Sequence, residues 1–186
     1  MIFFNLSFFR AYITSGASHG HGENDNSFST FGLPQRSIFQ QLSENNVTWI
    51  NYFNSSFNPD AEFYTWTKTE NKTTTNVKHI AQFFSDAQTG KLPQFSYINP
   101  EVRIYYLMPL FLSPMSLPCI DVLTISFLSI NQCCSFSSMH PPSPINLGEA
   151  WTKQIYEAVR GSPQWNNTLF IITFDEHGVC SKVSRI

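Results

Sequence analysis

Three stretches of the chain each read as a helix followed by a strand, and this alternation constrains the fold more than any other feature. The clearest stretch runs from residue 141 to residue 178, where Ser143 is placed to cap a helix and Pro144 to fill its first turn. Gly161 is placed to end it. One helical face carries an apolar stripe, formed by Leu147, Trp151, Ile155, Ala158 and Val159. Leu169 to Phe174 then reads as a strand that is apolar on both faces, as a central parallel strand is.

The two upstream stretches follow the same order. In residues 36–53, Ser37 is placed to cap a helix that Asn45 and Asn46 end, and Val47 to Phe53 is rich in strand-forming residues. In residues 76–100, Gly90 is a C-terminal stop and Phe95 to Ile98 follows as a strand. The helix before Gly90 is predicted from the spacing of Val77, Ile80, Ala81, Phe84 and Ala87.

Repeated helix–strand alternation predicts an α/β fold, a sheet with helices on both faces. Ligands of such sheets bind beyond the carboxyl ends of the strands. The last strand of this chain is followed at once by Asp175, Glu176 and His177, which a turn does not require. Taken alone, an Asp-Glu pair that ends a strand is more often a helix cap or a solvated turn. Its position in the predicted fold indicates a pair that holds a ligand.

Composition excludes some classes of protein and leaves others open. A chain of 186 residues is expected to form one domain, and a net charge of −2 provides neither a basic face for nucleic acid nor a polybasic membrane patch. The four cysteines contain no CxxC pair, so a thiolate zinc site is not expected. Glycosylation sequons favour a secreted or secretory-pathway protein, and they lie at Asn5, Asn46, Asn54, Asn71 and Asn166. Residues 1–17 resemble a signal peptide, but Arg10 interrupts the apolar run, so we expect folded sequence there.

Residues 102–132 fit the alternation poorly. The segment is long enough to span a membrane, yet Pro109, Pro114 and Pro118 interrupt it and Asp121 lies near its middle. An ordinary buried segment is a second interpretation. Our preferred hypothesis is an intron read through in frame, because the segment begins with Val, whose codons start GT, and ends with Gln, for which CAG is a codon. The same hypothesis covers the tail 179–186 and the residues before Arg10.

Four stretches together resemble the phosphoesterase family of bacterial-type phospholipase C enzymes and acid phosphatases, whose fold is related to alkaline phosphatase. They are "RAYITSGASHGHG", "FGLPQRSIFQQLSENNVTWINYF", "LPQFSYINPE" and "MHPPSPINLGEAWTKQIYEAVRGSPQWNNTLFIITFDEHG". The resemblance implies a partial alkaline-phosphatase-like sheet, with residues 10–178 as a fragment of a phosphoesterase domain that 102–132 interrupts. Without that segment the chain looks like an uninterrupted fungal member.

The resemblance implies hydrolysis of a phosphate ester or phospholipid, assisted by a divalent metal ion. The Asp-Glu pair of the family bears on that metal, so the role passes to Asp175 and Glu176, and carboxylate oxygens suit a hard cation. The His of the His-Pro-Pro motif lies at the phosphate in relatives, which makes His140 the candidate for stabilising charge or handing over a proton. His177 is a candidate for a second shell. His19 and His21 either support a metal or lie in a solvated glycine-rich turn.

The chain also departs from the family pattern. The Glu-Asn-x-Ser-Phe-Asp motif, which supplies further metal ligands, has no counterpart, and "MIFFNLSFF" replaces the stretch that carries the nucleophile. Val179 takes the place of the second Gly in Asp-Glu-His-Gly-Gly. With half a metal site and no nucleophile, the chain as written is expected to be inactive. The alternative is a non-catalytic membrane-associated or binding protein that uses the apolar segment 102–132.

Overall fold

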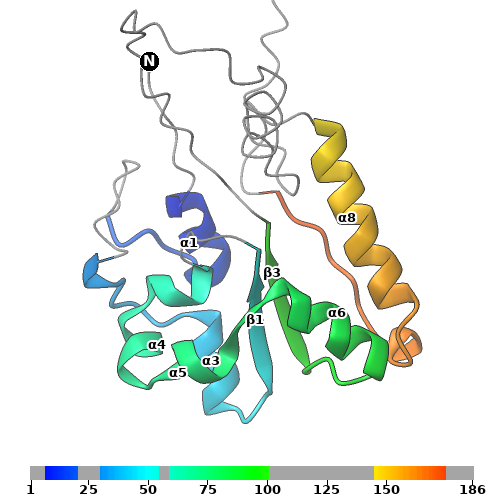
Figure 1. Cartoon of the computed structure of the whole chain (residues 1–186). Helices are drawn as coiled ribbons and strands as arrows, with labels where there is room; N and C mark the ends of the chain where they lie inside the picture. The colour runs from blue at the N-terminus through cyan, green and yellow to red at the C-terminus, as the bar shows by residue number, and fades with distance from the viewer. Residues whose placement is uncertain (1–6, 21–29, 55–58, 101–144, 175–186) are drawn as a thin grey trace, which may run out of the picture.

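A three-stranded parallel sheet organises the described part of the protein (Figure 1). The computed structural model describes residues 7–20, 30–54, 59–100 and 145–174. The strands are β1 (Trp49–Phe53), β2 (Val77–His79) and β3 (Phe95–Asn99), in the order β2-β1-β3. Asn51 of β1 lies opposite Val77 on one side and Tyr97 on the other. This arrangement confirms the predicted α/β fold as a partial sheet.

Helices cover both faces of this sheet (Figure 1). On one side lie α1 (Ser7–Ser15), α3 (Ile38–Glu44), α4 (Thr65–Thr69) and α5 (Lys72–Asn76), and on the other α6 (Ile80–Thr89) and α8 (Ile145–Arg160). Two short 3-10 turns complete the set, η1 (Asp60–Phe63) and η2 (Trp165–Asn167). Side chains alternate along a strand, so Trp49 and Tyr52 of β1 enter different cores. Phe39 packs with the first, and Phe83 and Ile155 pack with the second.

The first helix–strand unit forms as its sequence predicts. Ser37 caps α3, and its hydroxyl accepts a hydrogen bond from the backbone N–H of Gln40 at 3.3 Å. Asn45 is the C-terminal cap, and Asn46 follows in the left-handed region with φ of 57°. The strand itself begins at Trp49, two residues after the predicted start, because its ladder with β3 opens there.

The second unit differs at its start. Val77 was predicted on the helix, and this is wrong, because Val77 belongs to β2 and pairs with β1. The free edge of β1 supplies backbone partners that the helical spacing of the sequence does not reveal. The helix begins at Ile80, and the imidazole Nδ1 of His79 caps it by accepting from the backbone N–H of Ala81 at 3.2 Å. Gly90 ends α6 with φ of 67°, as predicted.

The third unit gives the predicted helix but not the predicted strand. Ile155 and Val159 of α8 are buried, and Trp151 and Ala158 pack beside them. Residues 169–174 adopt no strand and lie mostly exposed, with exposed fractions between 54% and 84% for Leu169, Ile171, Ile172 and Phe174. The prediction of a buried central strand there is therefore wrong. A strand needs a hydrogen-bonding neighbour, and none of the described strands pairs with this segment. The predicted caps Ser143 and Pro144 lie outside the described residues.

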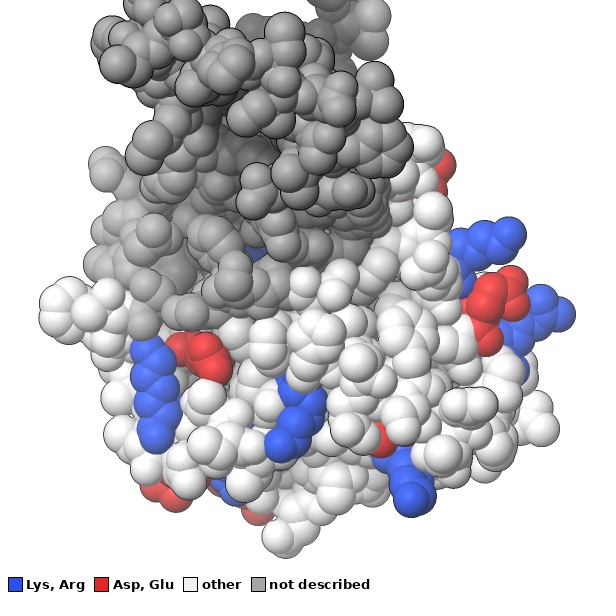
Figure 2. Space-filling view, in the orientation of Figure 1, with Lys and Arg blue, Asp and Glu red and all other residues white. Residues whose placement is uncertain are grey.

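The described surface mixes charges of both signs. Figure 2 shows Lys and Arg side chains spaced over this face, with acidic side chains beside several of them and the densest mixture along α8. Glu149, Lys153, Glu157 and Arg160 of α8 are all exposed. Within the described ranges, no helix has both the length and the apolar character that crossing a bilayer demands. The apolar segment 102–132 lies outside those ranges.

Candidate functional site

Most of the site residues predicted from the sequence lie outside the described part of the chain. These are His21, His140, Asp175, Glu176 and His177. His19 is described, and it is exposed in a turn with φ of 53°. Its place in a turn fits the solvated alternative as well as a supporting role near a metal. The assignments of the other five stay predictions.

A divalent metal ion held by Asp175 and Glu176 remains a prediction from the sequence. Two adjacent carboxylates provide the oxygen donors that hard divalent cations prefer, so the donor set fits such an ion. Across the residues that the structure does describe, no three His, Cys, Asp or Glu side chains gather closely enough to hold one.

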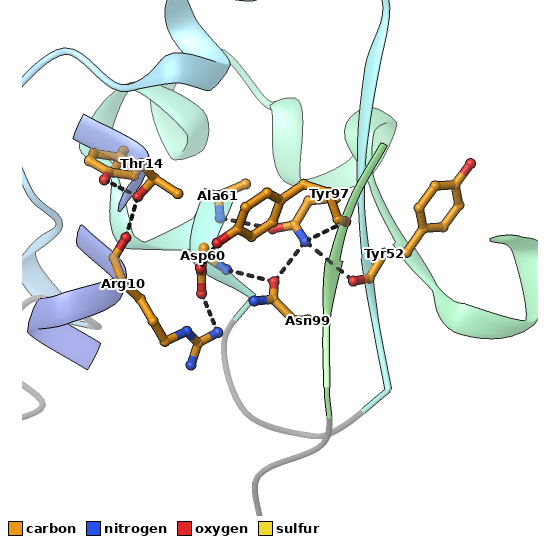
Figure 3. Close-up of polar contacts among 9 residues, drawn as sticks. Arg10, Thr14, Tyr52, Asp60, Ala61, Tyr97 and Asn99 are labelled. Carbon is orange, nitrogen blue, oxygen red and sulfur yellow. Dashed lines mark hydrogen bonds and ion pairs between the residues drawn. The ribbon is translucent and has the colours of Figure 1, made fainter. Parts of the chain in front are cut away.

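Asparagines from two neighbouring strands form the centre of a buried polar network (Figure 3). The side-chain amide of Asn51 on β1 donates to the side-chain oxygen of Asn99 on β3 at 2.7 Å. The side-chain oxygen of Asn99 also accepts a hydrogen bond from the backbone N–H of Asp60 at 3.2 Å. The side-chain oxygen of Asn51 accepts one from the backbone N–H of Ala61 at 2.9 Å, so both asparagines bind the first residues of η1. Both asparagines are buried. They fix the start of η1 against the sheet, near the carboxyl end of β3.

Asp60 is the charged member of this network and is fully buried. One carboxylate oxygen accepts a hydrogen bond from the Tyr97 hydroxyl at 2.7 Å. The other pairs with the guanidinium of Arg10, which reaches over from α1 (Figure 3). The guanidinium carbon also lies over the Phe63 ring, 5.3 Å from its centre. Burial raises the pKa of Tyr97 well above its usual value, and the negative charge of Asp60 adds to the rise. Tyr97 is therefore a neutral donor to the Asp60 carboxylate.

The same network extends along α1. The hydroxyl of Thr14 donates to the backbone carbonyl of Arg10 at 2.8 Å and lies 2.5 Å from the Tyr64 hydroxyl. Burial raises the pKa of Tyr64, which keeps that hydroxyl protonated. The Ser15 hydroxyl lies 2.8 Å from the backbone carbonyl oxygen of Ala11 and 2.9 Å from that of Ala17, and its single O–H donates to one of them at a time, which supports the helix end. Among these bonds, the contact between Thr14 and Tyr64 ties α1 to the residue that follows η1.

Sequence reasoning missed this network, although part of it leaves a signal. An amide within an apolar strand must find a partner, and "WINYF" and "FSYIN" each contain one, Asn51 and Asn99. Arg10 was considered only as an interruption of an apolar run. Nothing local marks Asp60 as buried, because its partners come from α1 and β3.

A second buried carboxylate–tyrosine pair lies on the opposite face of the sheet. The Tyr52 hydroxyl donates to Asp86 of α6 at 2.7 Å, and Gln82 donates to the other oxygen of Asp86 at 2.7 Å. Burial raises the pKa of Tyr52, and the hydrogen bond to Asp86 raises it further. This pair ties α6 to β1 on the face opposite the Asp60 network, so we assign it a role in stability.

The parallel sheet with helices on both faces places the protein in the α/β class. In this class, ligands bind beyond the carboxyl ends of the strands. Within that class, the model of the phosphoesterase family matches residues 6–183, and the chain belongs to this family. The family predicted from the sequence motifs is thereby confirmed.

The chain is similar to phospholipases of the plant Arabidopsis thaliana. It is 34% identical to non-specific phospholipase C4 of Arabidopsis thaliana over 169 residues, which is 91% of this chain and 26% of that protein. Non-specific phospholipase C5 of the same plant is 32% identical, with 91% of this chain and 27% of the relative covered. The chain thus spans about a quarter of the length of the curated relatives it matches.

Proposed function

We propose that this chain derives from a hydrolase of phosphate esters that acts on a phospholipid or a phosphomonoester. The family match over residues 6–183 carries the proposal, and the names of its phospholipase C relatives favour a lipid substrate. Asp175 and Glu176 would hold the divalent ion, which neutralises phosphate charge and activates the nucleophile when bound. His140 would face the phosphate and stabilise charge or pass a proton.

The 186-residue chain itself is proposed to be inactive, because no residue takes the place of the family nucleophile. The test is hydrolysis of phosphatidylcholine and of p-nitrophenyl phosphate by the purified chain, with and without added divalent ions. We expect no activity above that of Asp175→Ala. Metal-dependent turnover that Asp175→Ala abolishes would contradict the proposed inactivity while supporting the metal role of the pair.

The status of residues 102–132 decides which protein carries the activity. Sequencing the transcript across the codons for Glu101 to Cys133 tests the intron hypothesis directly. If the RNA joins these codons, the activity belongs to a chain without the segment. If mature RNA retains it, the 186-residue product is real, and the phosphoesterase label describes its ancestry.

A non-catalytic, membrane-associated role is the second candidate, favoured by the apolar character of 102–132. Carbonate washing of a membrane pellet tests it, because an integral protein stays with the pellet. Secretion is proposed from the sequons, and Asn46, Asn71 and Asn166 lie exposed while Asn54 is half-buried. A loss of apparent mass after glycosidase treatment of the expressed protein would support it, and an unchanged mass would contradict it.

A further inference from the structure

The Arg10–Asp60 ion pair lies near the carboxyl end of strand β3. Asn99 is the last residue of β3, and its side chain bonds to the backbone of Asp60. In Figure 3 the guanidinium of Arg10 turns away from α1 toward the carboxyl ends of β1 and β3. Parallel α/β sheets bind ligands beyond those ends. A guanidinium group, ion-paired with Asp60, is therefore present near the carboxyl ends of the strands.

Stability alone gives a weak reason for this pair. Burying a carboxylate completely costs desolvation free energy that one ion partner barely repays, and apolar residues of similar volume often serve as well. The chain nevertheless surrounds Asp60 with a tyrosine donor and anchors its backbone through Asn99. These hydrogen bonds hold the Asp60 carboxylate in one orientation. The carboxylate in turn orients the guanidinium of Arg10.

Arg10 is also only partly covered. Its side chain keeps 16% of its surface accessible, whereas Asp60 has none. A guanidinium carries five N–H donors in a planar fork, more than one carboxylate engages. Among the described residues, Asp60 is the carboxylate that pairs with it. Arg10 can thus bind Asp60 with one edge and still offer donors to a second anion.

We propose that Arg10 binds a phosphate oxygen of the ligand and that Asp60 is the positioning residue that holds its guanidinium for this contact. The inference rests on the proposed function, because a phosphate ester is the ligand class that it names. Guanidinium suits that class, since its parallel N–H groups match two oxygens of one phosphate. Lysine in the same place would keep the charge and lose the fork.

Binding of inorganic phosphate to the full 186-residue chain tests the proposal without requiring turnover. The probe is the rise in unfolding midpoint with phosphate, measured against sodium chloride at equal ionic strength, since a ligand of the folded state raises that midpoint. We expect a rise for the wild type and for the control Arg36→Gln, whose arginine pairs with Glu44 on the exposed surface. Arg10→Lys should weaken the apparent phosphate affinity about tenfold.

A second readout covers the case in which substitutions of Arg10 disturb folding. The guanidinium Nε–H resonance of Arg10 in the wild-type chain should shift on addition of phosphate and remain unmoved by chloride. Equal phosphate affinity in Arg10→Lys and wild type would overturn the proposal, as would an Arg10 resonance that phosphate does not move. Neither outcome bears on the hydrolase proposal, which the hydrolysis and transcript experiments decide separately.

Discussion

Replacement of Asp60 by Asn tests whether the buried network holds α1 and η1 on the sheet. The substitution keeps the shape of the side chain and removes its charge, so the Arg10 guanidinium loses its described carboxylate partner and Tyr97 loses an ionised acceptor. Removing one partner of a buried ion pair costs about 3 to 5 kcal/mol. Because Arg10 retains 16% of its side-chain surface for water, we expect the lower end, about 3 kcal/mol.

Such a loss is large against the about 5 to 15 kcal/mol that stabilises a typical domain. Urea denaturation followed by far-ultraviolet circular dichroism measures it as a lower midpoint with an unchanged slope. Glu44→Gln is the matched control, because Glu44 pairs with Arg36 on the exposed surface, and we expect no resolvable change in midpoint there. A midpoint for Asp60→Asn equal to that of Glu44→Gln would refute the reasoning and show that water, not the protein, solvates Asp60.

Five further substitutions probe other parts of the fold. Burial raises the pKa of Tyr52, so at high pH this tyrosine ionises in the unfolded chain before it ionises in the folded one. The free energy of unfolding should therefore fall as pH rises above about 10. Tyr52→Phe should flatten that fall in a series of urea titrations at different pH values. Gly32→Ala should cost about 3 kcal/mol, since its new Cβ would lie 2.9 Å from the backbone nitrogen of Thr65 at φ of 79°. Gly16→Ala, at φ of 74° with no described atom within 4 Å, should cost about 1 kcal/mol, and equal losses would contradict the clash. Ile155→Ala should cost about 3 kcal/mol and Ile171→Ala less than about 0.5 kcal/mol by denaturation; similar costs would mean that residues 169–174 are buried after all.

Local chemistry in the sequence determined the start of α3 and the end of α6. Ser37 and Gly90 act as predicted because a cap needs only the backbone of the adjacent turn, and a left-handed φ needs only a residue without Cβ. The family also followed from the sequence, because its motifs occur in a fixed order along the chain and can be read without knowing which residues are in contact. The α/β class followed from the alternation itself.

Partners distant in sequence decided the rest. Val77 joined a strand because β1 offered it a ladder, whereas Leu169 to Phe174 remained without one despite an apolar, strand-like sequence. Asp60 became buried because Arg10, Tyr97 and Asn99 converge on it from three other places in the chain. Hydrogen bonds between strands and the desolvation of a charge depend on what surrounds a residue, and only the tertiary structure sets those surroundings.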